Sequence, residues 1–357
     1  MLDTIPTELF ARIVNLAAPA AKPFSVQQKA RYGLLKSLSL VNKVIGQRAQ
    51  RLLWQDLRLT LPADKDRLEV SSNRLADAVT TLSLIVKPAT KPEKGSYAEP
   101  VEEDLQIITK LPNVQTLFVR TEAVVVGKAT KSWESDPFAF STIQLDFSAE
   151  SALRRLDSLF IMNGVLDLRN FASACALSLT RFALCGFLYS ATSLYKLFSP
   201  NVLPNLRQLR LGPVRREEGA METPWLRLPK IPKDFLDQPD FLEVGQRTYF
   251  GYGPLPESYT ATSTPTLVMM DEYVWEFPPI QSLHVVKHDP ISYKHEFLEK
   301  LTHLKAVFVE RCHQGSEFAE AFYDGCTARD VEVVWREAED YDFILPEFEA
   351  YIRRSSA

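Results

Sequence analysis

The feature that most constrains this chain is a nine-residue pattern, apolar-x-x-apolar-x-x-apolar-x-apolar, that recurs from residue 76 onward. The apolar-x-apolar end of each copy predicts a short strand with both side chains facing the core, and the two earlier apolar residues fix the incoming turn and helix. One such unit cannot bury its own apolar face, so neighbouring units must stack. The copies are Ala76/Val79/Leu82/Leu84, Leu111/Val114/Leu117/Val119, Leu153/Leu156/Leu159/Ile161, Ala176/Leu179/Phe182/Leu184, Leu203/Leu206/Leu209/Leu211, Phe277/Ile280/Leu283/Val285, Leu301/Leu304/Val307/Val309 and a degenerate Ala328/Val331/Val333.

The spacing of these copies resembles that of leucine-rich repeats, which run about 20–29 residues with one strand each. Four steps between copies are 23 to 27 residues, and the step across residues 212–276 is 74 residues, near three repeats. We therefore expect an α/β fold built as an irregular leucine-rich-repeat solenoid. Regular repeats place Asn or Cys three residues after the second strand residue, and only Cys312 stands there. A continuous Asn ladder is absent, so the sequence does not specify the curvature.

Three stretches interrupt the repeats: Lys87–Asp104, Gly127–Pro137 and Gly212–Glu276. The largest holds eight of the 23 prolines, and it reads either as further repeats or as a loop insertion. Aromatic side chains on a Pro-rich loop are typical of recognition surfaces, or they pack the insertion onto the solenoid. These aromatics are Trp225, Tyr249, Phe250, Tyr252, Tyr259, Tyr273 and Trp275.

The first sixty residues carry a different, helical periodicity. Pro6 suits the first turn of a helix, and an apolar stripe follows at Leu9, Ile13, Leu16 and Ala17. Ser25 with Gln28 reads as a capping box for a second helix, whose stripe continues at Leu34 and Leu38. A third helix is indicated by Val41, Ile45, Ala49 and Leu52. We expect a helical domain over residues 1–60 and the repeat domain over 61–357, with an insertion at about 212–276.

This opening resembles an F-box, most closely those of basidiomycete fungi. The matching elements are Ile5-Pro6-Thr7-Glu8-Leu9, Leu38-Ser39-Leu40-Val41-Asn42 and Leu52-Leu53-Trp54-Gln55-Asp56-Leu57. The resemblance implies docking on a Skp-type adaptor and, through it, on a cullin. The motif positions that would build or support that interface are Ile5, Pro6, Leu9, Ile13, Leu38, Val41 and Trp54.

The implied function is that of a substrate-recognition subunit of a cullin–RING (SCF-type) ubiquitin ligase. The repeats would bind an unknown target protein by their strand face or by residues 212–276, and the chain itself would be no enzyme. The family often has an aromatic residue where this chain has Val44-Ile45-Gly46. That departure favours the alternative, a leucine-rich-repeat scaffold whose F-box does not bind the adaptor.

Charge and cysteine usage limit the compartment and the partners. The formal net charge is −4, but residues 22–58 carry eight basic residues and one acid, and residues 317–349 carry eleven acids and two basic residues. No stretch is long enough for a transmembrane helix, no signal peptide is evident, and four cysteines fit reduced thiols. We expect a cytoplasmic or nuclear protein that binds neither membrane nor nucleic acid.

The sequence gives weak support for catalytic activity. All five histidines lie between residues 284 and 313, which leaves a hydrolase built on that segment as a remote alternative. His284 and His288 could share a metal only on a helix, and His284 lies in a predicted strand. No phosphate-binding glycine motif or nucleophile elbow is present. We expect no catalytic residue, cofactor or metal site.

Overall fold

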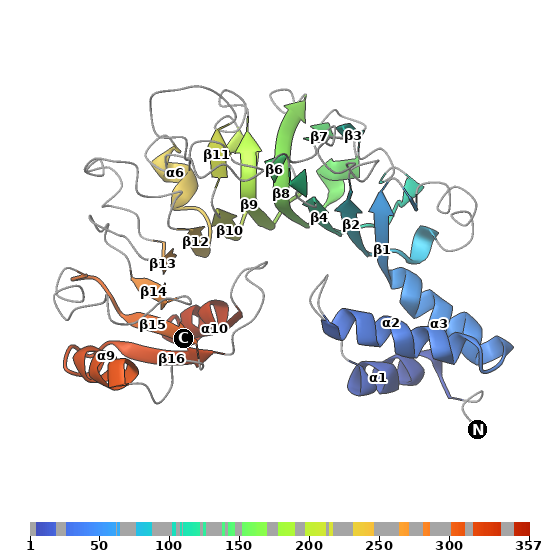
Figure 1. The fold of residues 1–357 in the computed structure, drawn as a ribbon, viewed down its shortest axis with the longest axis horizontal. Coiled ribbons are helices and arrows are strands. Elements are labelled where there is room, and N and C mark those ends of the chain that lie inside the picture. Colours follow the sequence, from blue (N-terminus) through green and yellow to red (C-terminus); the bar gives the residue numbers. More distant parts are fainter. Residues whose placement is uncertain are drawn as a thin grey trace. The chain divides into compact units, whose positions relative to one another are not determined.

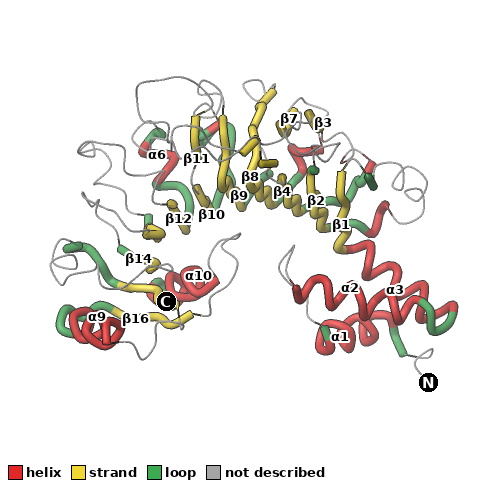
Figure 2. The backbone as a smooth tube through the Cα atoms, in the orientation of Figure 1, coloured by secondary structure: helices red, strands yellow, loops and turns green. Residues whose placement is uncertain are grey.

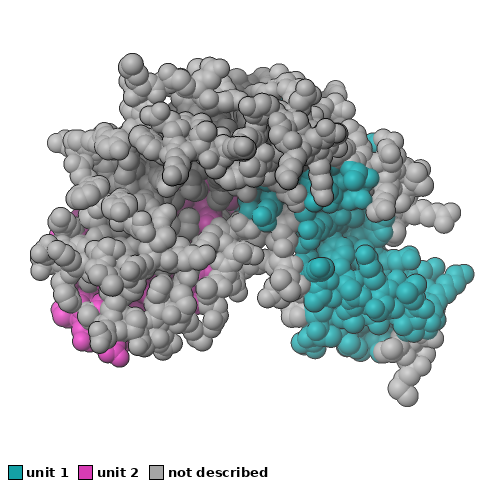
Figure 3. Space-filling view, in the orientation of Figure 1, with its two compact units in different colours: residues 1–164 teal, residues 165–357 magenta. Residues whose placement is uncertain are grey.

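The computed structural model shows a mixed α/β protein with a parallel sheet. It describes residues 5–18, 26–61, 63–64, 76–87, 102–104, 108, 110–121, 124–125, 138–139, 142–146, 152–169, 178–189, 197–211, 214–216, 231–245, 264–270, 281–285, 301–310, 317–336 and 346–357. The chain forms two compact units, Met1–Gly164 and Val165–Ala357 (Figure 3).

Three helices open the first unit, and the third runs directly into its first strand (Figure 1). The helices are α1 (Thr7–Ala17), α2 (Val26–Ser39) and α3 (Lys43–Gln55), and the strand is β1 (Asp56–Leu61). Asn42 caps α3, because its Oδ1 accepts a 2.9 Å hydrogen bond from the Ile45 N–H. The expected boundary at residue 60 lies inside β1, since the change from helix to strand takes place at Asp56.

The sheet of the first unit has the order β1-β2-β4-β8, with parallel pairing. Leu57, Leu82, Leu117 and Leu159 lie opposite one another in register and form one buried row. The last three occupy the same position of the nine-residue pattern, whereas Leu57 precedes its first copy. The remaining elements are η2 (Ala76–Ala78), β2 (Thr81–Val86), β3 (Glu102–Asp104), β4 (Thr116–Thr121), β5 (Val124–Val125), β6 (Phe138–Ala139), β7 (Thr142–Asp146), η4 (Ala152–Arg155) and β8 (Ser158–Arg169).

The second unit continues the same architecture in the order β9-β10-β12-β13-β14-β15-β16, and Figure 2 shows its strands in yellow. Parallel strands packed on both faces read as nearly continuous apolar runs, and Ala306–Val309 is such a run. Its elements are β9 (Arg181–Tyr189), β10 (Gln208–Leu211), β11 (Val214–Arg216), α6 (Lys233–Leu236), β12 (Phe241–Gly245), β13 (Thr266–Met270), β14 (Ser282–Val285), β15 (Ala306–Glu310), α9 (Glu317–Thr327), β16 (Glu332–Arg336) and α10 (Pro346–Ser355).

The structure adds two details to the predicted pattern. Residues 212–276, named as an insertion, supply β12 and β13, which join β10 to β14 in the sheet. The described residues of this stretch therefore include two strands of the sheet. In the last copy, β16 begins at Glu332, so Val333 lies opposite Val307 in the register and Val331 lies just before the strand. The seven aromatic residues singled out between 225 and 275 lie outside the described residues.

Among the described residues, no helix combines the length and apolar character that a bilayer span requires. The longest of the three helices in the first unit, α2, has 14 residues and carries Lys29, Arg31 and Lys36.

Candidate protein-docking surface

The three N-terminal helices pack on an apolar core that is separate from the repeat rows. Its buried members are Phe10, Val14, Leu35, Ile45 and Ala49, with Ile5, Leu38, Leu52 and Leu53 packed against it. α1 therefore buries the face that carries Phe10 and Val14. The stripe of Leu9, Ile13, Leu16 and Ala17 faces away from this core and lies exposed.

The exposed face of α1 carries three large apolar side chains at helical spacing. Leu9 is 47% exposed, Ile13 42% and Leu16 77%. Single exposed apolar residues are ordinary, but a row of them on one helix face is typical of a protein-interaction site. We take this face of α1 as the first part of a candidate docking surface.

The turn between α2 and α3 adds the second part. Leu40 is 85% exposed, Val41 58% and Val44 41%. Lys36 and Lys43, both exposed, flank the same turn and give it positive charge. Arg48 of α3 donates a hydrogen bond to the backbone carbonyl of Ile5, which holds the chain just before α1 against α3.

The seven residues that the F-box resemblance singled out divide into two groups. Pro6, Leu9, Ile13 and Val41 are exposed, and they belong to the parts described above. Ile5, Leu38 and Trp54 are half-buried, and Ile5 and Leu38 pack against the helical core. Leu16, Leu40 and Val44 are further exposed residues that the motif positions did not include. Leu16 belongs to the apolar stripe of α1, Leu40 lies in the turn after α2, and Val44 lies in the first turn of α3. The structure leaves all three outside the helical core.

Buried polar contacts fix the helices to the start of the sheet. The Tyr32 hydroxyl donates to the backbone carbonyl of Asp56, and the Arg31 guanidinium donates to the carbonyl of Ala18. Burial raises the pKa of Tyr32 well above its usual range, and the nearby Asp56 carboxylate acts in the same direction. Burial also raises the pKa of Asp56, while Arg31 opposes that shift. Tyr32 therefore ties α2 to the start of β1, and Arg31 ties α2 to the end of α1.

A pocket of about 250 Å³ lies where α1 and α3 meet the turn before β2. Its polar lining includes Thr7, Arg48, Arg51, Asp77 and Thr80. Small-molecule sites are usually about 300–1,000 Å³ and mostly apolar. This pocket is smaller than that range and its lining mixes charged with apolar side chains, so the apolar faces are the stronger candidate for recognition.

Gly46 explains part of the departure from the F-box pattern at Val44-Ile45-Gly46. A Cβ atom placed on Gly46 would lie 2.7 Å from the backbone oxygen of Ser39, in the preceding helix. The close approach of α2 and α3 at this position therefore needs a residue without a side chain. The departure has a packing reason within this chain.

We expect Gly46→Ala to destabilise the protein by about 1–3 kcal/mol, because overpacking against backbone cannot relax cheaply. Helix propensity alone predicts the opposite sign, a gain of up to about 1 kcal/mol. Gly33→Ala in α2 is the matched control, since a Cβ there meets nothing within 4 Å. Urea unfolding of both variants measures the difference, and a stabilised Gly46→Ala would contradict the close approach.

The residues considered for chemistry stay apart or lie outside the described residues. His284 lies in β14, as predicted, and His303 is exposed. His288, His295, His313 and Cys312 lie outside the described residues. Cys326 is a buried thiol, and burial raises its pKa to about 11, so it stays protonated at neutral pH. Within the described part of the chain, no group of three or more His, Cys, Asp or Glu side chains could hold a metal ion.

Comparison with known proteins adds no relative: no protein-family model, no curated protein and no solved structure matches this chain. The apolar faces of α1 and of the α2–α3 turn therefore have to be interpreted from their own chemistry.

Proposed function

We propose that the chain is the substrate-recognition subunit of a cullin–RING (SCF-type) ubiquitin ligase. Its three N-terminal helices would dock on a Skp-type adaptor, and its repeats would bind a target protein. The observation that carries this proposal is the exposure of Leu9, Ile13 and Val41, since these residues occupy F-box motif positions and are not used by the helical core. Covering an exposed apolar side chain with a partner removes apolar surface from water, which stabilises the complex.

Charge supports the same partner. Lys36 and Lys43 flank the exposed turn, and Lys29 and Arg51 are also exposed on these helices. A basic surface accelerates the encounter with an acidic partner, and it acts on the association rate more than on the final affinity. The chain would make no bond itself: its contribution is to raise the local concentration of a target lysine near the ubiquitin-loaded enzyme.

The test is co-expression with a Skp-type adaptor followed by size-exclusion chromatography of wild type and Leu9→Asp/Ile13→Asp. Both positions are exposed, so the substitutions leave the helical core intact. We expect the two buried carboxylates to weaken the complex at least about 100-fold, or about 2.7 kcal/mol. Ile5→Asp is a poorer choice, because Ile5 packs against the core.

The matched control is Arg12→Gln/Asn15→Asp, which lowers the net charge by the same two units on exposed positions of α1. It should still co-elute with the adaptor. If folded wild type fails to bind several adaptors, the receptor proposal is wrong. The three helices would then cap a repeat scaffold, the alternative that Val44-Ile45-Gly46 favours.

A further inference from the structure

Helix α10 covers part of the strand face in the second unit that points away from the repeat core. Phe348 is fully buried, and Tyr351 and Ile352 are buried beside it. They form one cluster with Phe241 of β12 and with Ala306 and Phe308 of β15; Val334 of β16 packs against it. Positions i, i+3 and i+4 share one face of a helix, so α10 presents a single apolar face to these strands.

The ring contacts in this cluster have the edge-to-face geometry that aromatic pairs prefer. The Phe348 and Phe308 ring centroids are 6.0 Å apart at an interplanar angle of 89°, and Phe348 and Phe241 are 6.1 Å apart at 70°. Tyr351 meets Phe308 at 5.9 Å and 87°. The strand face is therefore shaped to receive two aromatic rings spaced one helical turn apart.

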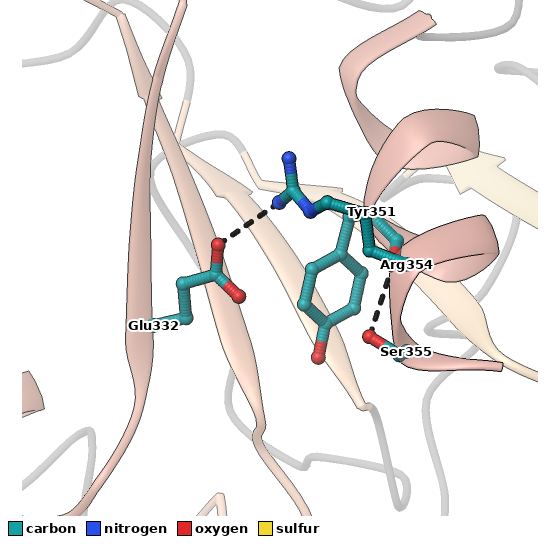
Figure 4. A network of polar contacts seen from close by, with 4 residues as sticks. All are labelled: Glu332, Tyr351, Arg354 and Ser355. Carbon is teal, nitrogen blue, oxygen red and sulfur yellow. Dashed lines mark hydrogen bonds and ion pairs between the residues drawn. The ribbon is translucent and has the colours of Figure 1, made fainter. Parts of the chain in front are cut away.

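Figure 4 shows two polar contacts of α10. Arg354 pairs with Glu332 of β16 at 3.0 Å, with the two side chains 63% and 50% exposed. The Ser355 hydroxyl donates a 3.0 Å hydrogen bond to the Tyr351 carbonyl, within the helix. Exposed ion pairs contribute little to stability, so the apolar face of α10 supplies most of the docking free energy. Glu332 favours a basic residue on the helix at the position of Arg354.

Strand alternation separates this cluster from the repeat core. Ala306 and Phe308 face α10, while Val307 and Val309 alternate with them on the other side and are also buried. Undocking α10 would uncover one face of β15 and leave the row formed by Leu283, Val307 and Val333 paired in the sheet. A helix of ten residues is marginal in water by itself, so α10 forms as it docks.

We propose that this strand face is the docking site for an amphipathic helix of the target protein, and that α10 occupies the site until such a helix displaces it. The target helix carries aromatic residues at its first and fourth positions, a β-branched aliphatic residue at the fifth and a basic residue at the seventh. These positions correspond to Phe348, Tyr351, Ile352 and Arg354, and this mode of recognition is a helix in an apolar groove. The inference rests on the proposed receptor function, because it names that receptor's target class.

The first measurement is native-state hydrogen exchange on the full chain. If α10 undocks while the sheet stays folded, the amides of α10 exchange at least tenfold faster than those of β15. If the α10 and β15 amides exchange together, α10 belongs to the cooperative unit of the sheet and the proposal is overturned. The experiment contains no adaptor, so its failure is distinct from a failure of adaptor docking.

The second measurement is a fluorescence-anisotropy titration with a labelled peptide of residues 344–357. The titrated proteins are the wild-type chain and Phe348→Asp/Tyr351→Asp, whose own α10 can no longer dock. We expect the peptide to bind the variant at least tenfold more tightly than wild type, because α10 competes for the site in wild type.

Peptide variants test the recognition pattern. A peptide with Phe348→Ala and Tyr351→Ala should bind at least tenfold more weakly, while Arg353→Ala should bind as well as the parent, since Arg353 is 69% exposed and contacts Glu349 within the helix. A folded variant protein that does not bind the parent peptide overturns the proposal. A variant protein that cannot fold also overturns the proposal, because the sheet would then need a docked α10 in order to fold.

Discussion

Replacing Glu243 with alanine is expected to destabilise the second compact unit by about 3–5 kcal/mol, the cost of breaking a buried ion pair by removing one of its partners. Glu243 of β12 lies opposite Arg210 of β10 in the sheet register. Arg210 Nε lies 3.2 Å from Glu243 Oε1, and each side chain is only 2% exposed. Removing the carboxylate leaves the guanidinium, which keeps its charge at every pH in use, in a site that excludes water.

Urea unfolding of the full chain, followed by circular dichroism, measures this loss. The pair Arg207–Asp240 is a matched control, because it also joins residues at the β10 and β12 strands but lies 3.6 Å apart with the side chains 66% and 55% exposed. Asp240→Ala should cost about 0–1 kcal/mol. An equal loss for Glu243→Ala and Asp240→Ala would mean that burial does not set the strength of these pairs.

A double variant separates the cost of breaking the pair from the net contribution of the intact pair to stability. Arg210→Met/Glu243→Leu removes both charges and keeps apolar volume in the strand face. We expect its stability to lie within about 1–2 kcal/mol of wild type, since buried ion pairs and well-packed apolar replacements are often nearly equivalent. If the double variant is as unstable as Glu243→Ala, the pair contributes through contacts that no apolar side chain can replace.

The repeat strands were predictable because two buried rows leave a direct trace in the sequence. Leu82/Leu84, Leu117/Val119 and Leu209/Leu211 each lie in a strand, and all six side chains are fully buried. The copy of the pattern that contains β12 was not recognised, because its second apolar position is a proline. Leu236, Pro239, Leu242 and Val244 follow the nine-residue spacing once Pro239, which is buried, is accepted as apolar.

The core face of α1 could not be chosen from periodicity. Leu9, Ile13 and Leu16 form one apolar stripe and Phe10 with Val14 form another, so helical spacing allows either face inside. The decision depends on Leu35, Ile45 and Ala49, which come from other helices. The place of α10 was hidden for the same reason: the partners of Phe348, Tyr351 and Ile352 on β12 and β15 are far away in sequence.

Phe10→Ala is expected to destabilise the three-helix core by about 3–5 kcal/mol, whereas Ile13→Ala should change stability by no more than about 0.5 kcal/mol. Both substitutions remove a large apolar side chain from α1. Phe10 is 3% exposed and packs with Val14, Leu35, Ile45 and Ala49, while Ile13 is 42% exposed. We expect the difference in burial, more than the difference in side-chain size, to set the two stability losses.

Hydrogen exchange of the α1, α2 and α3 amides, read by mass spectrometry, reports this core separately from the repeats. Phe10→Ala should raise exchange across all three helices, because they share one cluster. Ile13→Ala should leave exchange unchanged and weaken adaptor binding. A large stability loss from Ile13→Ala would show that the outer face of α1 is needed for folding, and the docking surface would then have to lie at Leu40, Val41 and Val44 alone.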